Sequence, residues 1–244
     1  RKSSMDNRPI GVFDSGLGGL TGVRELRKRL PHEDIIYFGD TGRVPYGSRS
    51  PETILQYARQ DVAFLRQYDL KSIIIACNTA TSIALRYVQQ RFLPLEAPDV
   101  KVLGVVIPTV EVAIENGARR VGVAATTATV RSHIYQTELH KLNPGLAVTE
   151  IAVPGLVPAI EDNDFSRAEA VVRACAPGFA NCDSLILGCT HYPLLRSTVR
   201  EIMGEGVNLV NPAYETAVEL RRLLAEQGIA NDGKAQDGEE KYQF

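Results

Sequence analysis

The chain has 244 residues, of which 44% are hydrophobic and 23% are charged, and its net charge is −2. This balance gives no electrostatic reason to expect nucleic acid or a membrane surface as a partner. No apolar run approaches the roughly 20 residues that a membrane helix needs. The cysteines form no CxxC pair and no dense disulfide framework, so we expect free thiols in a reducing cytoplasm; they are Cys77, Cys175, Cys182 and Cys189.

Both ends of the chain are polar. Residues 1–8 lack the apolar segment of a secretion signal, and we expect them to form a flexible leader. Residues 231–244 are polar and contain glycine, and we expect a loose tail there. The folded part of the chain is therefore expected between these two segments.

Short apolar runs rich in Ile and Val alternate with amphipathic helical patterns along most of the chain. Most of these runs are uniformly apolar, which is typical of strands buried on both faces and hence of a parallel sheet. The alternation predicts an α/β fold with short connections. The expected strands are Ile10–Phe13, Ile35–Phe38, Ser72–Ala76, Val102–Val106, Val121–Ala124, Ala147–Ile151, Ser184–Leu187 and Val207–Val210. The expected helices are Leu20–Leu30, Pro51–Tyr68, Ala80–Phe92, Val110–Asn116, Thr129–Lys141, Ser166–Ala174, Leu194–Ile202 and Tyr214–Gln227.

The sequence contains an internal repeat. The segment Val121–Ala124 resembles Ile10–Phe13 at an offset of 111 residues, and Leu185–Cys189 resembles Ile73–Cys77 at an offset of 112. The agreement predicts two similar lobes with mainly parallel sheets, related by a pseudo-twofold axis; chance similarity between short apolar motifs is the alternative. We expect the lobes over residues 9–98 and 99–210, followed by a helix over 211–230 that returns to the first lobe.

Polar clusters directly follow several of the expected strands. Ligands bind beyond the carboxyl ends of the strands in open parallel sheets, so two lobes placed face to face would gather these clusters in one cleft. Helix capping also explains Asp, Ser, Thr and Asn at such positions, but it does not explain cysteine. The clusters are Asp14-Ser15, Gly39-Asp40, Cys77–Thr79, Thr126 and Cys189–His191.

Cys77 and Cys189 each fall between an expected strand and the start of a helix. A helix N-terminus stabilises an anion, so we expect it to lower the pKa of a thiol. One such cysteine is as readily a small buried apolar residue, but two at matching places in two repeats favour chemistry. Racemisation needs a matching pair, because one group removes the Cα proton and another returns a proton to the opposite face. Asp14 and His191 are candidates to assist them.

The glycine-rich segment Gly16–Gly22 follows a strand and opens a helix, as a dinucleotide site would. Its spacing fails, because the third glycine of the GxGxxG pattern falls on Thr21. We expect its backbone amides to approach a small anion such as a carboxylate instead. The polar clusters contain no lysine for pyridoxal phosphate, and the cysteine and histidine spacing does not match a zinc site. We therefore expect no organic cofactor and no metal.

Taken together, these motifs closely resemble the glutamate racemase family; they are Phe13–Gly19, Gly39-Asp40 with Pro45–Gly47, Ala76–Ala80 and Leu187–Pro193. The resemblance runs from about residue 9 to residue 220. It implies two α/β lobes with the site between them, no metal or organic cofactor, and a homodimer. It also implies interconversion of L-glutamate and D-glutamate, with D-glutamate supplied for bacterial peptidoglycan.

By this resemblance, Cys77 and Cys189 are the two acid/base thiols, and Asp14 and His191 assist them. A supporting glutamate of the family falls near Glu161. The family continues past Phe244 into a last strand and helix, so we expect this chain to be shortened. The substrate-binding residues that the resemblance implies are Asp14, Ser15, Pro45, Tyr46, Gly47, Cys77, Asn78, Thr79, Thr126, Thr129, Cys189, Thr190 and His191.

Three other functions stay open on the residues alone. A non-catalytic amino-acid-binding protein would share the cleft without needing thiols, so ordinary titration of both cysteines would favour it. A Cys-His hydrolase would use Cys189 and His191 and accumulate an acyl-enzyme. A dinucleotide oxidoreductase would change the fluorescence of added NAD(P)H.

Overall fold

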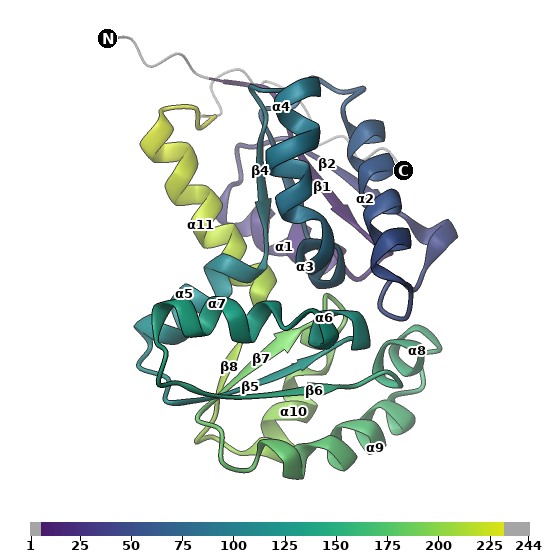
Figure 1. Cartoon of the computed structure of the whole chain (residues 1–244), viewed down its shortest axis with the longest axis vertical. Coiled ribbons are helices and arrows are strands. Elements are labelled where there is room, and N and C mark those ends of the chain that lie inside the picture. The colour runs from purple at the N-terminus through teal and green to yellow at the C-terminus, as the bar shows by residue number, and fades with distance from the viewer. Residues whose placement is uncertain (1–5, 232–244) are drawn as a thin grey trace.

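Two sheets of four parallel strands form the framework of the computed structural model, which describes residues 6–231 (Figure 1). The first sheet has the strand order β2-β1-β3-β4, and the second has the order β6-β5-β7-β8. All neighbouring strands pair in parallel. The strands are β1 (Ile10–Asp14), β2 (Ile35–Gly39), β3 (Ser72–Ile75), β4 (Lys101–Gly104), β5 (Arg120–Ala125), β6 (Ala147–Ala152), β7 (Ser184–Gly188) and β8 (Asn208–Val210).

The two sheets share one topology, because adding four to each strand number of the first sheet gives the second. Strand β1 thus corresponds to β5 and β3 to β7, which are the pairs that the sequence offsets matched. The predicted α/β fold with two similar lobes is confirmed. The lobe boundary expected between residues 98 and 99 is wrong, because β4 pairs with β3 and extends the first sheet to Gly104. The short apolar sequence of β4 does not indicate which of the two sheets the strand joins.

Helices connect the strands and enclose both sheets. No helix within residues 6–231 is long and apolar enough to cross a membrane. The helices are α1 (Leu20–Arg29), α2 (Pro51–Leu65), α3 (Asn78–Tyr87), α4 (Leu93–Glu96), α5 (Val106–Glu115), α6 (Thr127–Ser132), α7 (Ile134–Leu142), α8 (Leu156–Glu161), α9 (Phe165–Cys175), α10 (Arg196–Met203) and α11 (Pro212–Gln227). The shorter helical turns are η1 (Thr41–Arg43), η2 (Val88–Phe92), η3 (Ala176–Phe179) and η4 (Tyr192–Leu195).

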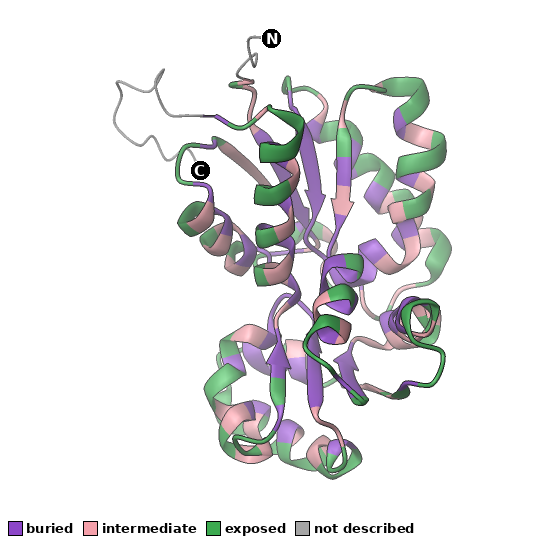
Figure 2. Cartoon of the chain, turned by 90° about the vertical axis from the view of Figure 1, so that its left-hand side faces the viewer, coloured by how far each residue is buried: buried purple, intermediate pink, exposed green. Residues whose placement is uncertain are grey.

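Both faces of each sheet are buried. In β3, Ile73 and Ile75 pack in a core with residues of α2 and α3, whereas Ile74 packs in a core with residues of α1 and α11. The second lobe follows the same rule, since Leu185 of β7 packs on one side and Ile186 on the other. Successive side chains of a strand point to opposite faces, so these strands are apolar throughout. Figure 2 shows the buried strands between helices with exposed outer faces.

Two of the expected helices have the wrong bounds, and neither α4 nor α8 was expected. The helix expected over Thr129–Lys141 is divided into α6 and α7, because His133 adopts a left-handed conformation with a φ of 53°. Helix α5 begins at Val106 instead of Val110, and the preceding strand ends at Gly104. The hydrophobic pattern of the sequence does not indicate the division between α6 and α7 or the start of α5, because apolar residues continue across both positions.

Helix α11 lies against the first lobe (Figure 1). It packs on α1 and buries Ala217, Leu220 and Leu224 beneath the first sheet. It also contacts α5, which directly follows β4 and leads into the second lobe. The end of the described chain thus returns to the lobe in which the chain begins.

A buried lysine ties the two ends of the described chain together. Nζ of Lys71 lies 2.5 Å from Oε2 of Glu33, and both side chains are almost fully buried. The same Nζ donates hydrogen bonds to the carbonyl oxygens of Asp6 at 2.8 Å and Ile229 at 2.9 Å. The expectation of a flexible leader is therefore wrong for residues 6–8. The rest of that leader and the tail beyond residue 231 lie outside the described residues.

We predict that Lys71→Met lowers the free energy of unfolding by about 3 kcal/mol, because it leaves the Glu33 carboxylate buried without its partner. Urea unfolding followed by circular dichroism measures the change. Lys28→Met is the matched control, since Lys28 is exposed and lies 3.9 Å from Glu25; it should cost less than about 0.5 kcal/mol. A loss below about 1 kcal/mol for Lys71→Met would contradict the prediction.

Candidate active site

Cys77 is the thiol of the first lobe. It follows β3 directly, is 5% exposed, and stands at the N-cap position of α3. Its Sγ accepts a hydrogen bond from the backbone N–H of Ala80 at 3.4 Å. The backbone N–H and the hydroxyl of Ser15, which follows β1, lie near this sulfur and act to lower its pKa. Polar groups from two strand ends therefore surround Cys77.

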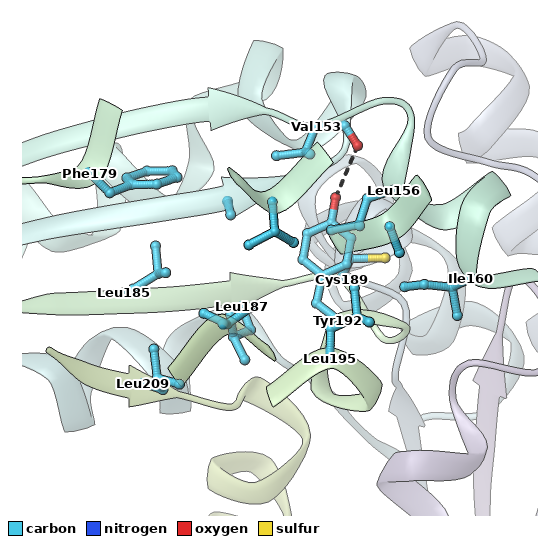
Figure 3. Close-up of a cluster of buried hydrophobic side chains, with 14 of the residues drawn as sticks. Val153, Leu156, Ile160, Phe179, Leu185, Leu187, Cys189, Tyr192, Leu195 and Leu209 are labelled. Carbon is cyan, nitrogen blue, oxygen red and sulfur yellow. Dashed lines mark hydrogen bonds between the residues drawn. The ribbon is translucent and has the colours of Figure 1, made fainter. Parts of the chain in front are cut away.

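Cys189 is the thiol of the second lobe. It follows β7 and is 8% exposed, and the backbone N–H of His191 and the hydroxyl of Thr190 act to lower the pKa of its thiol. The expected helix start is wrong here, because the chain continues into the turn η4 before α10 begins. Figure 3 shows Cys189 at the border of the second lobe's core, beside Tyr192, whose hydroxyl donates to the carbonyl oxygen of Val153 at 3.4 Å.

The two thiols lie close enough for Cys77 to influence the ionisation of Cys189. Burial, and then the negative charge of Asp14, raise the pKa of the Cys77 thiol to about 12. Burial raises the pKa of Cys189 even further, and Cys77 and Asp14 add to that rise. The expectation that a helix N-terminus lowers these pKa values is therefore wrong. The N–H and hydroxyl donors act in the lowering direction, but desolvation outweighs them.

Asp14 connects the glycine-rich segment to the second lobe. Its carboxylate is fully buried and accepts hydrogen bonds from the N–H groups of Gly19 at 2.8 Å and Gly16 at 3.3 Å. The anion that this segment approaches is thus the protein's own carboxylate. The hydroxyl of Thr190 donates to the same group at 3.4 Å. Burial raises the pKa of Asp14, whereas the Gly19 N–H and the His191 ring lower it.

His191 stands between Cys189 and Glu161. Its Nδ1 lies 3.9 Å from the Cys189 sulfur, and its Nε2 lies 2.9 Å from Oε1 of Glu161 on α8. A carboxylate only accepts hydrogen bonds, so Nε2 carries a proton, and Nδ1 of a neutral ring presents its lone pair to the thiol. The family resemblance placed a supporting glutamate only near Glu161. In the structure, the Glu161 carboxylate holds the ring of His191.

Threonine hydroxyls from both lobes meet beside Cys77. Oγ1 of Thr79 lies 2.7 Å from Oγ1 of Thr126 and 3.4 Å from that of Thr129. The backbone of Gly47 lies against Thr126 of this cluster, because a Cβ added to Gly47 would lie 2.7 Å from Cβ of Thr126. The carbonyl oxygen of Gly47 also accepts from the N–H of Ala128 at 3.0 Å. The structure thus brings these predicted binding residues together.

The segment Pro45–Gly47 reaches this cluster through its backbone. Tyr46 is 1% exposed, and its hydroxyl bonds to Asp61 at 2.5 Å and to Asp40. Arg43 pairs with the same two carboxylates. The Tyr46 side chain therefore faces these acids inside the first lobe, and its assignment to substrate binding stays a prediction, as does that of Pro45.

Sequence reasoning missed two tyrosines that contact this site. The hydroxyl of Tyr37 on β2 donates to the carbonyl oxygen of Gly16 at 2.5 Å. Burial, and then the charges of Asp14 and Cys77, raise the pKa of Tyr37. Tyr135 of α7 donates to Oδ1 of Asn78. Both have the apolar neighbours of ordinary core residues, so only the three-dimensional position of their hydroxyls connects them with the site.

Residues 22–220 match the family model described as Asp/Glu/Hydantoin racemase. The chain belongs to this family. It is 42% identical over 224 residues to a glutamate racemase of Streptococcus gordonii, covering 90% of this chain and 83% of that protein.

Two solved structures resemble the fold closely. A glutamate racemase from Bacillus anthracis is 38% identical, has a TM-score of 0.87, and matches over 93% of this chain and 85% of its own. A glutamate racemase from Francisella tularensis, solved in complex with D-glutamate, is 40% identical and has a TM-score of 0.86. That match covers 94% of this chain and 86% of the other.

The raised pKa of Cys77 predicts slow alkylation. At pH 8 a thiol with a pKa of about 12 holds about one thiolate in ten thousand molecules, and its reaction rate should rise about tenfold with each pH unit. Iodoacetamide labelling followed by peptide mass spectrometry measures each cysteine separately. Cys182, which is less buried, is the internal control and should react first. Faster labelling of Cys77 than of Cys182 at pH 7.5 would contradict the raised pKa.

Proposed function

We propose that the protein is a glutamate racemase that works with two thiols and without a cofactor. The observation that carries the proposal is the convergence of Cys77 and Cys189, one from each lobe, at the carboxyl ends of corresponding strands. A hydrolase using the Cys189–His191 contact would leave Cys77 and the polar groups around it without a role. Glutamate as the substrate is supported by the identity of about 40% with glutamate racemases from two bacteria.

In this reaction the Cα of glutamate lies between the two sulfurs. One thiolate removes the Cα proton, the C–H bond breaks, and its electron pair passes into the adjacent carboxylate. The opposite thiol then donates its proton to the other face of Cα, where a new C–H bond forms. The reverse direction exchanges the two roles, which explains the need for two groups that act as acid or as base.

The raised pKa values mean that a thiolate must be generated when the substrate binds. Nδ1 of His191 is placed to accept the proton of Cys189. Asp14, whose own pKa is raised, is the corresponding candidate for Cys77. The ammonium group of the amino acid adds a positive charge, which favours ionised sulfur in a buried site.

Hydroxyl and amide groups around the thiols are suited to the two carboxylates of glutamate. We assign this role to the side chains of Ser15, Asn78, Thr79, Thr126 and Thr190, with Thr129 behind them. These neutral donors bind carboxylates without adding a fixed positive charge. The wider role that fits such a reaction is the supply of D-glutamate for peptidoglycan, in the cytoplasm and as a homodimer.

The decisive test is proton exchange at Cα. We expect the purified protein to incorporate deuterium at Cα of both L-glutamate and D-glutamate in deuterated water without any added cofactor. Cys77→Ser and Cys189→Ser should each reduce racemisation by at least about 10³-fold, because a serine hydroxyl is a far weaker acid than a thiol. Proton NMR and circular dichroism follow exchange and racemisation separately.

Cys182→Ser is the control for these variants and should retain full activity, because Cys182 precedes β7 whereas Cys189 follows it. Absence of exchange in the wild-type protein with either enantiomer would refute the proposal. Full racemisation by either single active-site variant would refute the two-thiol mechanism while leaving the substrate assignment intact.

A second prediction concerns Glu161, whose carboxylate bonds to the histidine that serves Cys189. Glu161→Gln should lower kcat/KM equally for both enantiomers, by about 10-fold to 100-fold, because the equilibrium constant of racemisation is one. The Cα-deuterium isotope effect should rise only for the enantiomer that Cys189 deprotonates. Competitive rate measurements with α-deuterated L-glutamate and D-glutamate provide both quantities.

Asp162→Asn is the matched control, since Asp162 is the next residue and pairs with Arg167 on the surface. It should leave both rates and both isotope effects unchanged. An equal rise of the two isotope effects in Glu161→Gln would show that Glu161 does not act through one thiol.

A further inference from the structure

Tyr135 is a side chain of the second lobe whose hydroxyl reaches the first. It lies on α7, is fully buried, and donates a hydrogen bond to Oδ1 of Asn78, the first residue of α3. Asn78 directly follows Cys77 and is only 3% exposed. The bond therefore connects a core residue of one lobe to the residue beside the thiol of the other.

The ring of Tyr135 lies close to the second thiol. A Cβ added to Gly188, which precedes Cys189, would stand 3.6 Å from Cε2 of the ring. Burial, and then the neighbouring Cys189, raise the pKa of Tyr135 far above its ordinary value. The hydroxyl therefore keeps its proton and acts as a donor at neutral pH. Thr109 is the other polar side chain at this hydroxyl.

This hydrogen bond fixes the orientation of an amide. Asparagine has one acceptor oxygen and one NH₂ group on opposite sides of the same carbon. Because Tyr135 occupies Oδ1, the NH₂ group of Asn78 is turned away from α7, and it has no protein acceptor in the described part of the chain. An NH₂ group at that position is a donor suited to a carboxylate.

We propose that Tyr135 is a positioning residue for racemisation, which holds the Asn78 amide so that its NH₂ group faces a substrate carboxylate beside Cys77. This inference rests on the proposed function. A contact with a substrate carboxylate already forms when the substrate binds, so its loss should raise KM. Tyr135 also joins the surroundings of the two thiols, because its ring lies beside Gly188, which precedes Cys189.

The test is Tyr135→Phe, which removes only the hydroxyl. We expect KM for both enantiomers of glutamate to rise about tenfold, with kcat changed by less than about threefold. Tyr87→Phe is the matched control, because Tyr87 is at the opposite end of α3, and it should leave KM unchanged. An unchanged KM in Tyr135→Phe would overturn the inference.

A double-mutant cycle separates positioning from general packing. If Tyr135 acts through Asn78, Asn78→Ala should raise KM, and Tyr135→Phe should add nothing to that rise in the double variant. Effects that multiply would overturn the inference. Thermal unfolding of all three variants shows whether any rise in KM comes from a loss of stability.

A measurement without substrate keeps this inference distinct from the proposed function. In ¹⁵N NMR spectra, the NH₂ signals of Asn78 should shift in Tyr135→Phe, and the wild-type hydroxyl proton of Tyr135 should show a nuclear Overhauser contact with that amide. If the wild type does not racemise glutamate but the Asn78 signals shift in Tyr135→Phe, the proposed function is refuted. The inference that Tyr135 orients the Asn78 amide is then still supported. If the contact and the shift are both missing, the inference fails whatever the activity.

Discussion

Burial of the two thiols is the constraint on which the rest of the site depends. Cys77 follows β3 and Cys189 follows β7, and each of these strands lies between two others in a sheet that is covered on both faces. A group placed there loses water on every side, and its anion is penalised accordingly. The N–H groups and hydroxyls around each sulfur are therefore necessary, because they replace part of the solvation that the strand position removes.

The same constraint explains why so many hydrogen bonds cross between the lobes. The hydroxyl of Thr21 donates to the carbonyl oxygen of Thr190 at 3.2 Å, and the hydroxyl of Thr190 in turn contacts Asp14. On the other side of the thiols, Thr79 meets Thr126. Polar groups at buried strand ends must pair, and here the nearest partners belong to the opposite lobe. In the proposed reaction, the carboxylates of glutamate replace bonds of this kind.

The sequence was sufficient for the approximate positions of the strands, for the repeat and for the placement of Cys77 and Cys189 after corresponding strands, because each of these depends on local patterns. It was insufficient for the pKa of Cys77, since a helix N-terminus is visible in a sequence and the depth of burial is not. The histidine contact of Glu161 and the hydroxyl of Tyr135 were beyond reach for a similar reason. Both depend on how α7 and α8 are placed on the second sheet, which apolar periodicity does not specify.

The symmetry of the two lobes ends at the proposed proton acceptors. One hydroxyl lies near each sulfur and acts to lower its pKa, that of Ser15 for Cys77 and that of Thr190 for Cys189. Beyond them stand a fully buried carboxyl, Asp14, and a histidine whose supporting Glu161 is 39% exposed at its side chain. A racemase does not require identical partners, because an equilibrium constant of one fixes only the ratio of the two kcat/KM values. The individual barriers on the two sides of Cα are free to differ, and these unlike environments are the physical reason to expect that they do.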